Sequence, residues 1–129
     1  MANRPDLAES SDFAPAFGPD GLIACVTVDD ASGDVLMVAH MNALAIKKTL
    51  ATGQMHYWSR SRQSLWRKGE TSGQTQSLRE LRVDCDQDAV LARVVVAGDG
   101  GACHTGRRSC FYRRVRTAGV GASLILEEG

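Results

Sequence analysis

Apolar residues in this chain fall into short runs separated by polar turns, a pattern typical of β-strands. The first run ends at an acidic pair, and the Ala-Ser-Gly-Asp turn over 31–34 predicts a hairpin with the next run. The strands predicted in this way cover residues 22–28, 35–39, 54–58, 76–83, 89–97 and 111–115, with a weaker apolar stretch at 124–126.

One segment has the features of a helix. Asn42 is suited to cap its N-terminus, apolar residues follow through Leu50, and Gly53 stands where a left-handed residue commonly ends a helix. The chain contains no internal repeat. We therefore expect an α+β fold, a mostly antiparallel β-sheet with one main short helix.

The length of 129 residues allows one hydrophobic core and one domain. We expect a disordered or loosely ordered lead-in over residues 1–19, the domain over 20–116 and a tail over 117–129. The lead-in lacks the cationic start and apolar stretch of a secretory signal, and no apolar run approaches the roughly 20 residues needed to span a bilayer. These features predict a cytoplasmic protein without membrane contact.

The charges cancel overall, with 15 Lys plus Arg against 15 Asp plus Glu, which argues against a general nucleic-acid binder. They are nevertheless sorted along the chain. Residues 1–34 hold seven acids and one base, whereas residues 107–116 hold five arginines and no acid. A local site for a small anion therefore remains compatible with the neutral total.

The four cysteines are expected to be reduced in the cytoplasm. Cys25 lies in an apolar run and is interpreted as a buried core thiol. Cys85, Cys103 and Cys110 stand among polar residues, although their spacing is not that of a standard paired-thiol motif. Three thiolates suit Zn²⁺ and leave one position for water, but three unrelated thiols remain an alternative. His104 adjoins Cys103 and therefore fits better as a base beside the metal than as a ligand.

A second metal site is suggested by alternating acids. In an extended segment Asp84, Asp86 and Asp88 project from one face, while Cys85 projects from the other. Oxygen ligands favour Mg²⁺ or Ca²⁺, and a solvated acidic loop is the alternative. An EF-hand is excluded, because its glycine and distal glutamate are missing.

A polar stretch before the acidic motif has the composition of an anion site. Arginines, hydroxyls and glycine amides donate to phosphate, and Trp58 and Trp66 are candidates to stack on a base or sugar. A solvated basic loop is the alternative, and the glycine pattern of a P-loop is absent. We assign no chemistry to His40 or to His56.

Four segments of this sequence, 56–62, 65–73, 84–88 and 103–112, occur together in an order that resembles the phosphoribosyl-AMP cyclohydrolase family. The resemblance extends over residues 21–113, about three quarters of the chain. It departs from the family at His40, where a tyrosine is common, and this position lies outside the metal motifs. The chain end suggests the monofunctional form, which functions with a separate phosphoribosyl-ATP pyrophosphohydrolase.

The resemblance implies a homodimer and a hydrolase of L-histidine biosynthesis that opens the adenine ring of phosphoribosyl-AMP between N1 and C6 with a zinc-activated water. It implies that Cys85, Cys103 and Cys110 hold zinc. We expect His104 to be the catalytic base. The magnesium ligands implied are Asp84, Asp86 and Asp88. The candidate substrate contacts are Trp58, Ser59, Arg60, Ser61, Arg62, Trp66, Lys68, Thr71, Ser72, Arg107 and Arg108.

Three alternatives remain open from the sequence. Arg107 and Arg108 could pair with the acidic loop instead of a second phosphate. A zinc nucleobase deaminase would use similar water chemistry, but the His-x-Glu pairing it needs is absent. A non-enzymatic zinc-stabilised binding module would have a closed four-ligand site and no turnover.

Overall fold

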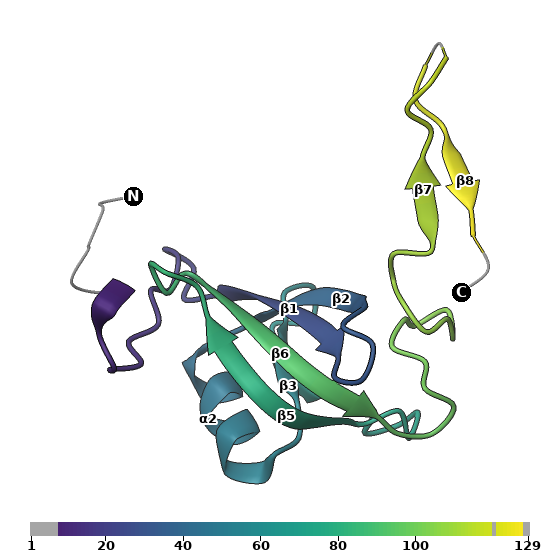
Figure 1. Ribbon diagram of the computed structural model, residues 1–129. Coiled ribbons are helices and arrows are strands. Elements are labelled where there is room, and N and C mark those ends of the chain that lie inside the picture. Colours follow the sequence, from purple (N-terminus) through teal and green to yellow (C-terminus); the bar gives the residue numbers. More distant parts are fainter. Residues whose placement is uncertain (1–7, 120, 128–129) are drawn as a thin grey trace.

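The computed structural model describes residues 8–119 and 121–127, so the expected lead-in and tail lie partly outside the described residues (Figure 1). Residues 8–9 are helical, and the longer helix α2 and eight β-strands follow. In chain order these are β1 (Ile23–Asp29), β2 (Val35–Met41), α2 (Ala43–Thr52), β3 (His56–Ser59), β4 (Ser64–Arg67), β5 (Gln76–Val83), β6 (Ala89–Val96), β7 (Arg113–Val115) and β8 (Leu124–Leu126).

The main sheet has four strands in the order β2-β1-β6-β5. The β1–β2 and β5–β6 pairs are antiparallel hairpins, and β1 and β6 run parallel in the middle of the sheet. The prediction of an α+β fold with a mostly antiparallel sheet is confirmed. The parallel pair was not predicted, because its two strands are far apart in the sequence and no local pattern connects them.

The core lies on one face of this sheet, where α2 and the β3–β4 hairpin contact β2 and each other. Alternate residues of β6 (Val90, Ala92 and Val94) point into the core, as the period of a strand requires. Cys25 is completely buried, which confirms its predicted place, and burial raises its pKa to about 11. This thiol is therefore a packing group and stays protonated at neutral pH.

The helix begins and ends where the sequence predicts. The Asn42 side chain accepts a hydrogen bond from the Ala45 amide at 2.8 Å, and Gly53 adopts a left-handed conformation with φ of 73°. Its buried residues, Ala45, Ile46 and Thr49, recur at helical spacing. The two caps fix the position at which the chain turns from β2 towards β3.

The polar stretch over 59–72 contains a strand that the sequence pattern did not predict. Ser64–Arg67 forms β4, which pairs with β3 and half-buries Leu65 and Trp66. Two apolar residues among so many polar ones gave too weak a pattern to identify a strand. The resulting hairpin is important for the site, because it holds the arginine- and serine-rich turn beside the core.

The C-terminal β7–β8 hairpin projects away from the main sheet (Figure 1). Its first strand, β7, is shorter than the strand predicted over 111–115, because Phe111 and Tyr112 lie before it. Phe111, Val115, Leu124 and Leu126 are each more than half exposed. In the described part of the chain, no helix has the length and apolar character needed to cross a membrane.

Candidate active site

A cavity of about 630 Å³ lies where the β3–β4 turn, the β4–β5 turn and the loop after β6 meet. These segments are far apart in the sequence, and the β3–β4 hairpin brings two of them together. The cavity is lined by Ser59, Ser61, Arg62, Trp66, Lys68, Gly69, Glu70, Thr71, Ser72, Gln74, Cys103, His104 and Gly106. It therefore combines cationic and hydroxyl donors with a thiol and an imidazole.

Seven of the predicted substrate contacts line this cavity, namely Ser59, Ser61, Arg62, Trp66, Lys68, Thr71 and Ser72. Trp58, Arg60, Arg107 and Arg108 are not among its lining residues. Glu70 and Gln74 also line it, and the sequence pattern did not single them out. Their position inside the polar stretch was the available signal, but nothing local distinguishes a lining residue from its solvated neighbours.

Lys68 is buried to 8% exposure, which is unusual for a lysine. Its Nζ donates to the Ala102 carbonyl at 2.7 Å and lies 5.3 Å from the centre of the Trp66 ring. Burial lowers the pKa of Lys68, and the nearby thiols of Cys110 and Cys103 oppose this. The ammonium thus connects β4 to the loop that carries the cysteines.

Cys103 and Cys110 form a thiol pair beside Lys68. Burial by itself would raise the pKa of Cys103, but hydrogen bonds from Thr105 and Cys110 outweigh it and lower this pKa. Burial, with the neighbouring Cys103, raises the pKa of Cys110 to about 11. Of the two thiols, Cys103 therefore loses its proton more readily, and a soft cation bound by both sulfurs would displace their protons.

The loop around this pair is fixed by backbone hydrogen bonds. The Cys103 amide donates to the Arg107 carbonyl at 3.0 Å, and the Cys110 amide donates to the Leu36 carbonyl at 2.7 Å. The Thr105 hydroxyl donates to Cys103 Sγ at 3.1 Å. These bonds fix the backbone at both cysteines and orient Cys103 Sγ.

Cys85 lies apart from the Cys103–Cys110 pair. It is exposed in the turn between β5 and β6. Figure 1 shows this turn at the opposite end of the β5–β6 hairpin from the loop after β6, which carries Cys103. The eight residues of β6 span about 26 Å at the usual rise of about 3.3 Å per residue. Within residues 8–119 and 121–127, the three cysteines do not form a common group of potential metal ligands.

The predicted aspartate cluster is formed in the same turn. Asp84, Asp86 and Asp88 place one carboxylate oxygen each within 4.8 Å of the others. Hydrogen bonding to Asp84 and Asp86, together with their negative charge, raises the pKa of Asp88 to about 6. Three crowded oxygen donors, of which Asp88 has the raised pKa, fit a hard divalent cation, because its charge would remove their repulsion.

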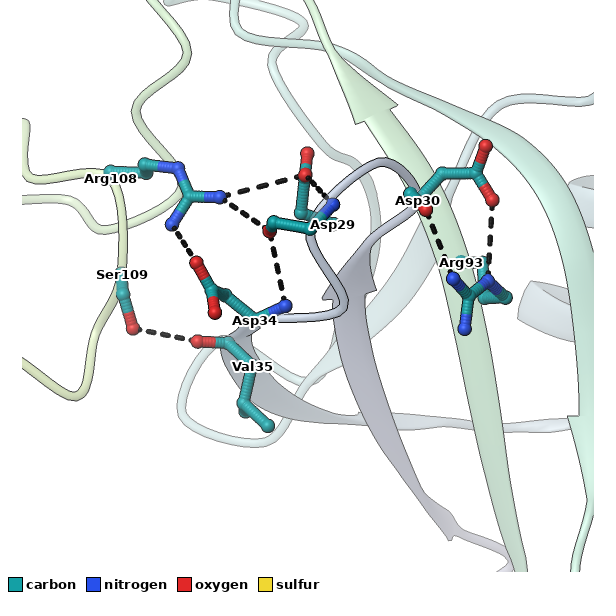
Figure 2. A network of polar contacts seen from close by, with 8 residues as sticks. Asp29, Asp30, Asp34, Val35, Arg93, Arg108 and Ser109 are labelled. Atoms are coloured by element: carbon teal, nitrogen blue, oxygen red, sulfur yellow. Dashed lines mark hydrogen bonds and ion pairs between the residues drawn. The ribbon is translucent and has the colours of Figure 1, made fainter.

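Arg108 is engaged with the β1–β2 turn and not with the aspartate cluster (Figure 2). Its guanidinium contacts the carboxylates of Asp34 at 3.0 Å and Asp29 at 3.5 Å. It also donates to the Ser32 hydroxyl at 2.9 Å. Arg107 instead stacks on Tyr112, with 4.1 Å between its guanidinium carbon and the ring centre. Arg108 therefore holds the cysteine loop against the main sheet.

The three histidines occupy different environments. His104 is exposed and lines the cavity next to Cys103. His56 is buried, and its Nδ1 lies 2.8 Å from the Gln54 carbonyl, so its role is structural. His40 lies on β2, where burial and the charge of Arg60 lower its pKa. Of the three, His104 is the one whose imidazole lines the cavity.

Gly69 illustrates how closely the cavity wall is packed. A Cβ at this position would lie 2.3 Å from the Gln74 carbonyl carbon and from the Thr75 nitrogen, and φ is +81°. We expect Gly69→Ala to lower the free energy of unfolding by at least about 2–3 kcal/mol and to weaken substrate binding, because backbone must move.

Gly73 provides a matched control for this substitution. It has φ of +80°, but its Cβ would meet nothing within 4 Å. Gly73→Ala is expected to lower the free energy of unfolding by about 1 kcal/mol, because backbone strain is its only cost. Urea unfolding measures both values, and equal losses in the two variants would contradict the packing argument.

Comparison with known proteins agrees with this geometry. Residues 37–112 match the family model described as phosphoribosyl-AMP cyclohydrolase. Three relatives with that name come from Bradyrhizobium diazoefficiens, Brucella canis and a Chelativorans species. They are 58%, 54% and 55% identical to this chain over 96%, 97% and 99% of its length, and over 87%, 90% and 91% of their own.

A cavity that combines phosphate-type donors with a thiol and an imidazole has the make-up of an enzyme site for a small anionic substrate. The matches then identify the family. This chain belongs to the phosphoribosyl-AMP cyclohydrolase family.

Proposed function

We propose that this protein hydrolyses phosphoribosyl-AMP, a step of L-histidine biosynthesis, by opening its adenine ring between N1 and C6. The observation that carries the proposal is the cavity in which Arg62, several hydroxyls and Trp66 face Cys103 and His104. Membership of the family specifies the reaction. A volume of about 630 Å³ is within the usual range for a small-molecule site.

Each group has a distinct role in this proposal. Arg62 and the hydroxyls of Ser59, Ser61, Thr71 and Ser72 bind phosphate, since guanidinium and hydroxyl groups donate to its oxygens. Trp66 supplies an aromatic face for the purine. Together they orient C6 of the adenine towards the cysteine loop.

His104 accepts the proton of the attacking water at an imidazole nitrogen. The water oxygen forms a bond to C6, the C6–N1 bond breaks, and N1 takes up a proton. The C6 carbonyl and the exocyclic amine then form the carboxamide of the imidazole product. Substitution at N1 makes C6 electrophilic, so the protein has to deliver only a positioned, deprotonated water.

The three cysteines fit a zinc ion, because thiolate sulfurs are ligands that zinc prefers. The Cys103–Cys110 pair would supply two neighbouring sulfurs, and Cys85 would be the third ligand. When bound, zinc would supply the Lewis acidity that lowers the pKa of a water. Lys68 would hold the loop and offset part of the thiolate charge.

A homodimer would complete this site. Cys85 lies about one strand length from the thiol pair of its own chain, so a second copy has to supply it. Phe111, next to Cys110, and the exposed apolar residues of the β7–β8 hairpin would offer a surface for such a copy. A two-fold arrangement would then create two equivalent sites.

Magnesium would bind at Asp84, Asp86 and Asp88. Asp88 has a folded pKa of about 6, above its usual 3.8, so the folded state binds its proton more tightly than the unfolded state. Its ionisation therefore costs stability as the pH rises towards about 6 and above. We expect Mg²⁺ to raise the melting temperature clearly at pH 7.5 and little at pH 5.

Asp88→Asn tests this pH dependence. It is expected to raise the metal-free melting temperature at pH 7.5 and to weaken Mg²⁺ binding by at least about tenfold. Scanning calorimetry with and without Mg²⁺ measures both effects. The exposed Asp99, which lies outside the cluster, provides the control Asp99→Asn. An Mg²⁺ effect that is the same at both pH values would contradict the cluster.

We also place this enzyme in the cytoplasm, next to a separate phosphoribosyl-ATP pyrophosphohydrolase that supplies its substrate. The neutral charge balance supports a small anionic substrate over nucleic acid.

Turnover is the direct test of the reaction. The purified chain is incubated with phosphoribosyl-AMP, and the carboxamide product is followed by absorbance and mass spectrometry. We expect product in the presence of zinc and its loss with a chelator. Loss of the amine with an intact ring would indicate a deaminase, and absence of turnover in the zinc-loaded protein would contradict the proposal.

A further inference from the structure

The N-terminal segment over residues 12–16 lies along the β5–β6 turn and is attached to it by one residue, Gln87. The Gln87 side chain donates from Nε2 to the Asp12 carbonyl at 3.0 Å and accepts from the Ala14 amide at 2.7 Å. The Gln87 carbonyl accepts from the Ala16 amide at 2.7 Å. These hydrogen bonds thus connect two segments that are distant in the sequence.

Gln87 is itself buried, with 3% exposure, although it occupies the middle of a polar turn. Its φ is +58°, a conformation that non-glycine residues adopt rarely. A buried amide is stable only when its donor and acceptor are both paired, and here the N-terminal backbone provides both partners. If the segment were released, the Gln87 side chain would lose both partners. The hydrogen bonds that stabilise this conformation of the turn would then be missing.

The same turn carries all the proposed metal donors outside the cysteine loop. Asp86 and Asp88 flank Gln87, and Asp84 Oδ1 accepts from the Asp88 and Ala89 amides at 2.9 and 3.2 Å. Cys85 lines a cavity of about 220 Å³ whose other wall is residues 10–13. The N-terminal segment therefore contacts the turn directly beside the residues that would bind metal.

We propose that the N-terminal segment is a latch: through the Gln87 amide, residues 12–16 hold the turn 84–88 in the conformation that presents its carboxylates and Cys85. Gln87 is a positioning residue in this role and binds no metal. The role rests on the proposed function, because it takes Asp84, Asp86 and Asp88 as cation ligands. The segment lies outside residues 37–112, the part of the chain that matches the family model.

The test breaks the hydrogen bonds of the latch by changing first the turn and then the N-terminal segment. Gln87→Met keeps the length of the side chain and loses both side-chain hydrogen bonds to the N-terminal segment. Ala14→Pro removes the backbone N–H that donates to the Gln87 side chain. Gln63→Met is the matched control, because Gln63 also has positive φ (50°) and donates to a backbone carbonyl, but in the β3–β4 turn. Two properties are measured in the full-length protein: amide exchange over residues 84–89 without metal, and Mn²⁺ affinity by electron paramagnetic resonance.

We expect both latch variants to exchange about tenfold faster over 84–89 and to bind Mn²⁺ about tenfold more weakly, with Gln63→Met unchanged. The double variant should lose little more than either single variant, since both break the same contact. Should Gln87→Met fail to fold, Ala14→Pro still provides the test.

One result would overturn the latch: the amide at 16, and in Gln87→Met also the amide at 14, loses protection while exchange over 84–89 and Mn²⁺ affinity stay within about twofold of the unmodified chain. Failure of the proposed metal site is distinguishable from this. If the unmodified chain does not bind Mn²⁺, the magnesium site is wrong, and the amide exchange alone decides whether the segment holds the turn.

Discussion

Replacing Cys110 with serine is expected to abolish stoichiometric zinc binding and to lower kcat/KM by about 1000-fold or more. Serine keeps the size of the side chain but removes the soft thiolate that zinc prefers. A catalytic metal supplies several kcal/mol of stabilisation in the transition state, and about 4 kcal/mol corresponds to about three orders of magnitude in rate. Zinc content by mass spectrometry and steady-state kinetics measure the two effects.

Cys25→Ala is the control for this variant, because Cys25 is a thiol of the core with no access to the cavity. Its zinc content and kcat are expected to be those of the unmodified enzyme, although its stability falls. A Cys110→Ser enzyme that retained both zinc and turnover would show that this cysteine is not a ligand.

Replacing His104 with alanine should lower kcat by about 100- to 10,000-fold while zinc remains bound. This is the usual contribution of a general base, and His104 is the histidine that lines the cavity beside Cys103. Imidazole added to the solution should restore part of the activity, which a purely structural defect would not allow.

His40→Tyr is the matched control, since His40 lies on β2 and does not line the cavity. We expect it to retain kcat. Near-normal turnover of zinc-loaded His104→Ala would contradict the assignment of the base.

The sequence predicted local features well because local interactions determine them. The caps of α2 and the alternation in β6 follow from neighbouring residues, and the motifs of the cavity and of the aspartate cluster are contiguous. Asp84, Asp86 and Asp88 gather as the sequence predicts, but the expected extended segment is wrong: residues 84–88 form a turn in which Gln87 has φ of +58°.

Features that depend on tertiary packing could not be predicted in this way. Lys68 was expected to contact the substrate, and it lines the cavity. The bond from its Nζ to the Ala102 carbonyl could not be predicted, because β5 and β6 separate the two residues in the sequence. The environment of Arg108 depends on the β1–β2 turn, which lies near the other end of the chain. The separation of Cys85 from Cys103 follows from the length and direction of β6, and the spacing along the chain does not indicate it.

The mixing of two inactive variants tests the central claim, that two copies of the chain complete each active site. Cys85→Ser and Cys110→Ser are purified separately, unfolded together, refolded with zinc and assayed. Random pairing makes half of the dimers mixed, and each mixed dimer has one site with all three cysteines, so about one quarter of the normal activity should return. If the mixture stays as inactive as its components, each site is built from one chain, and the account is wrong.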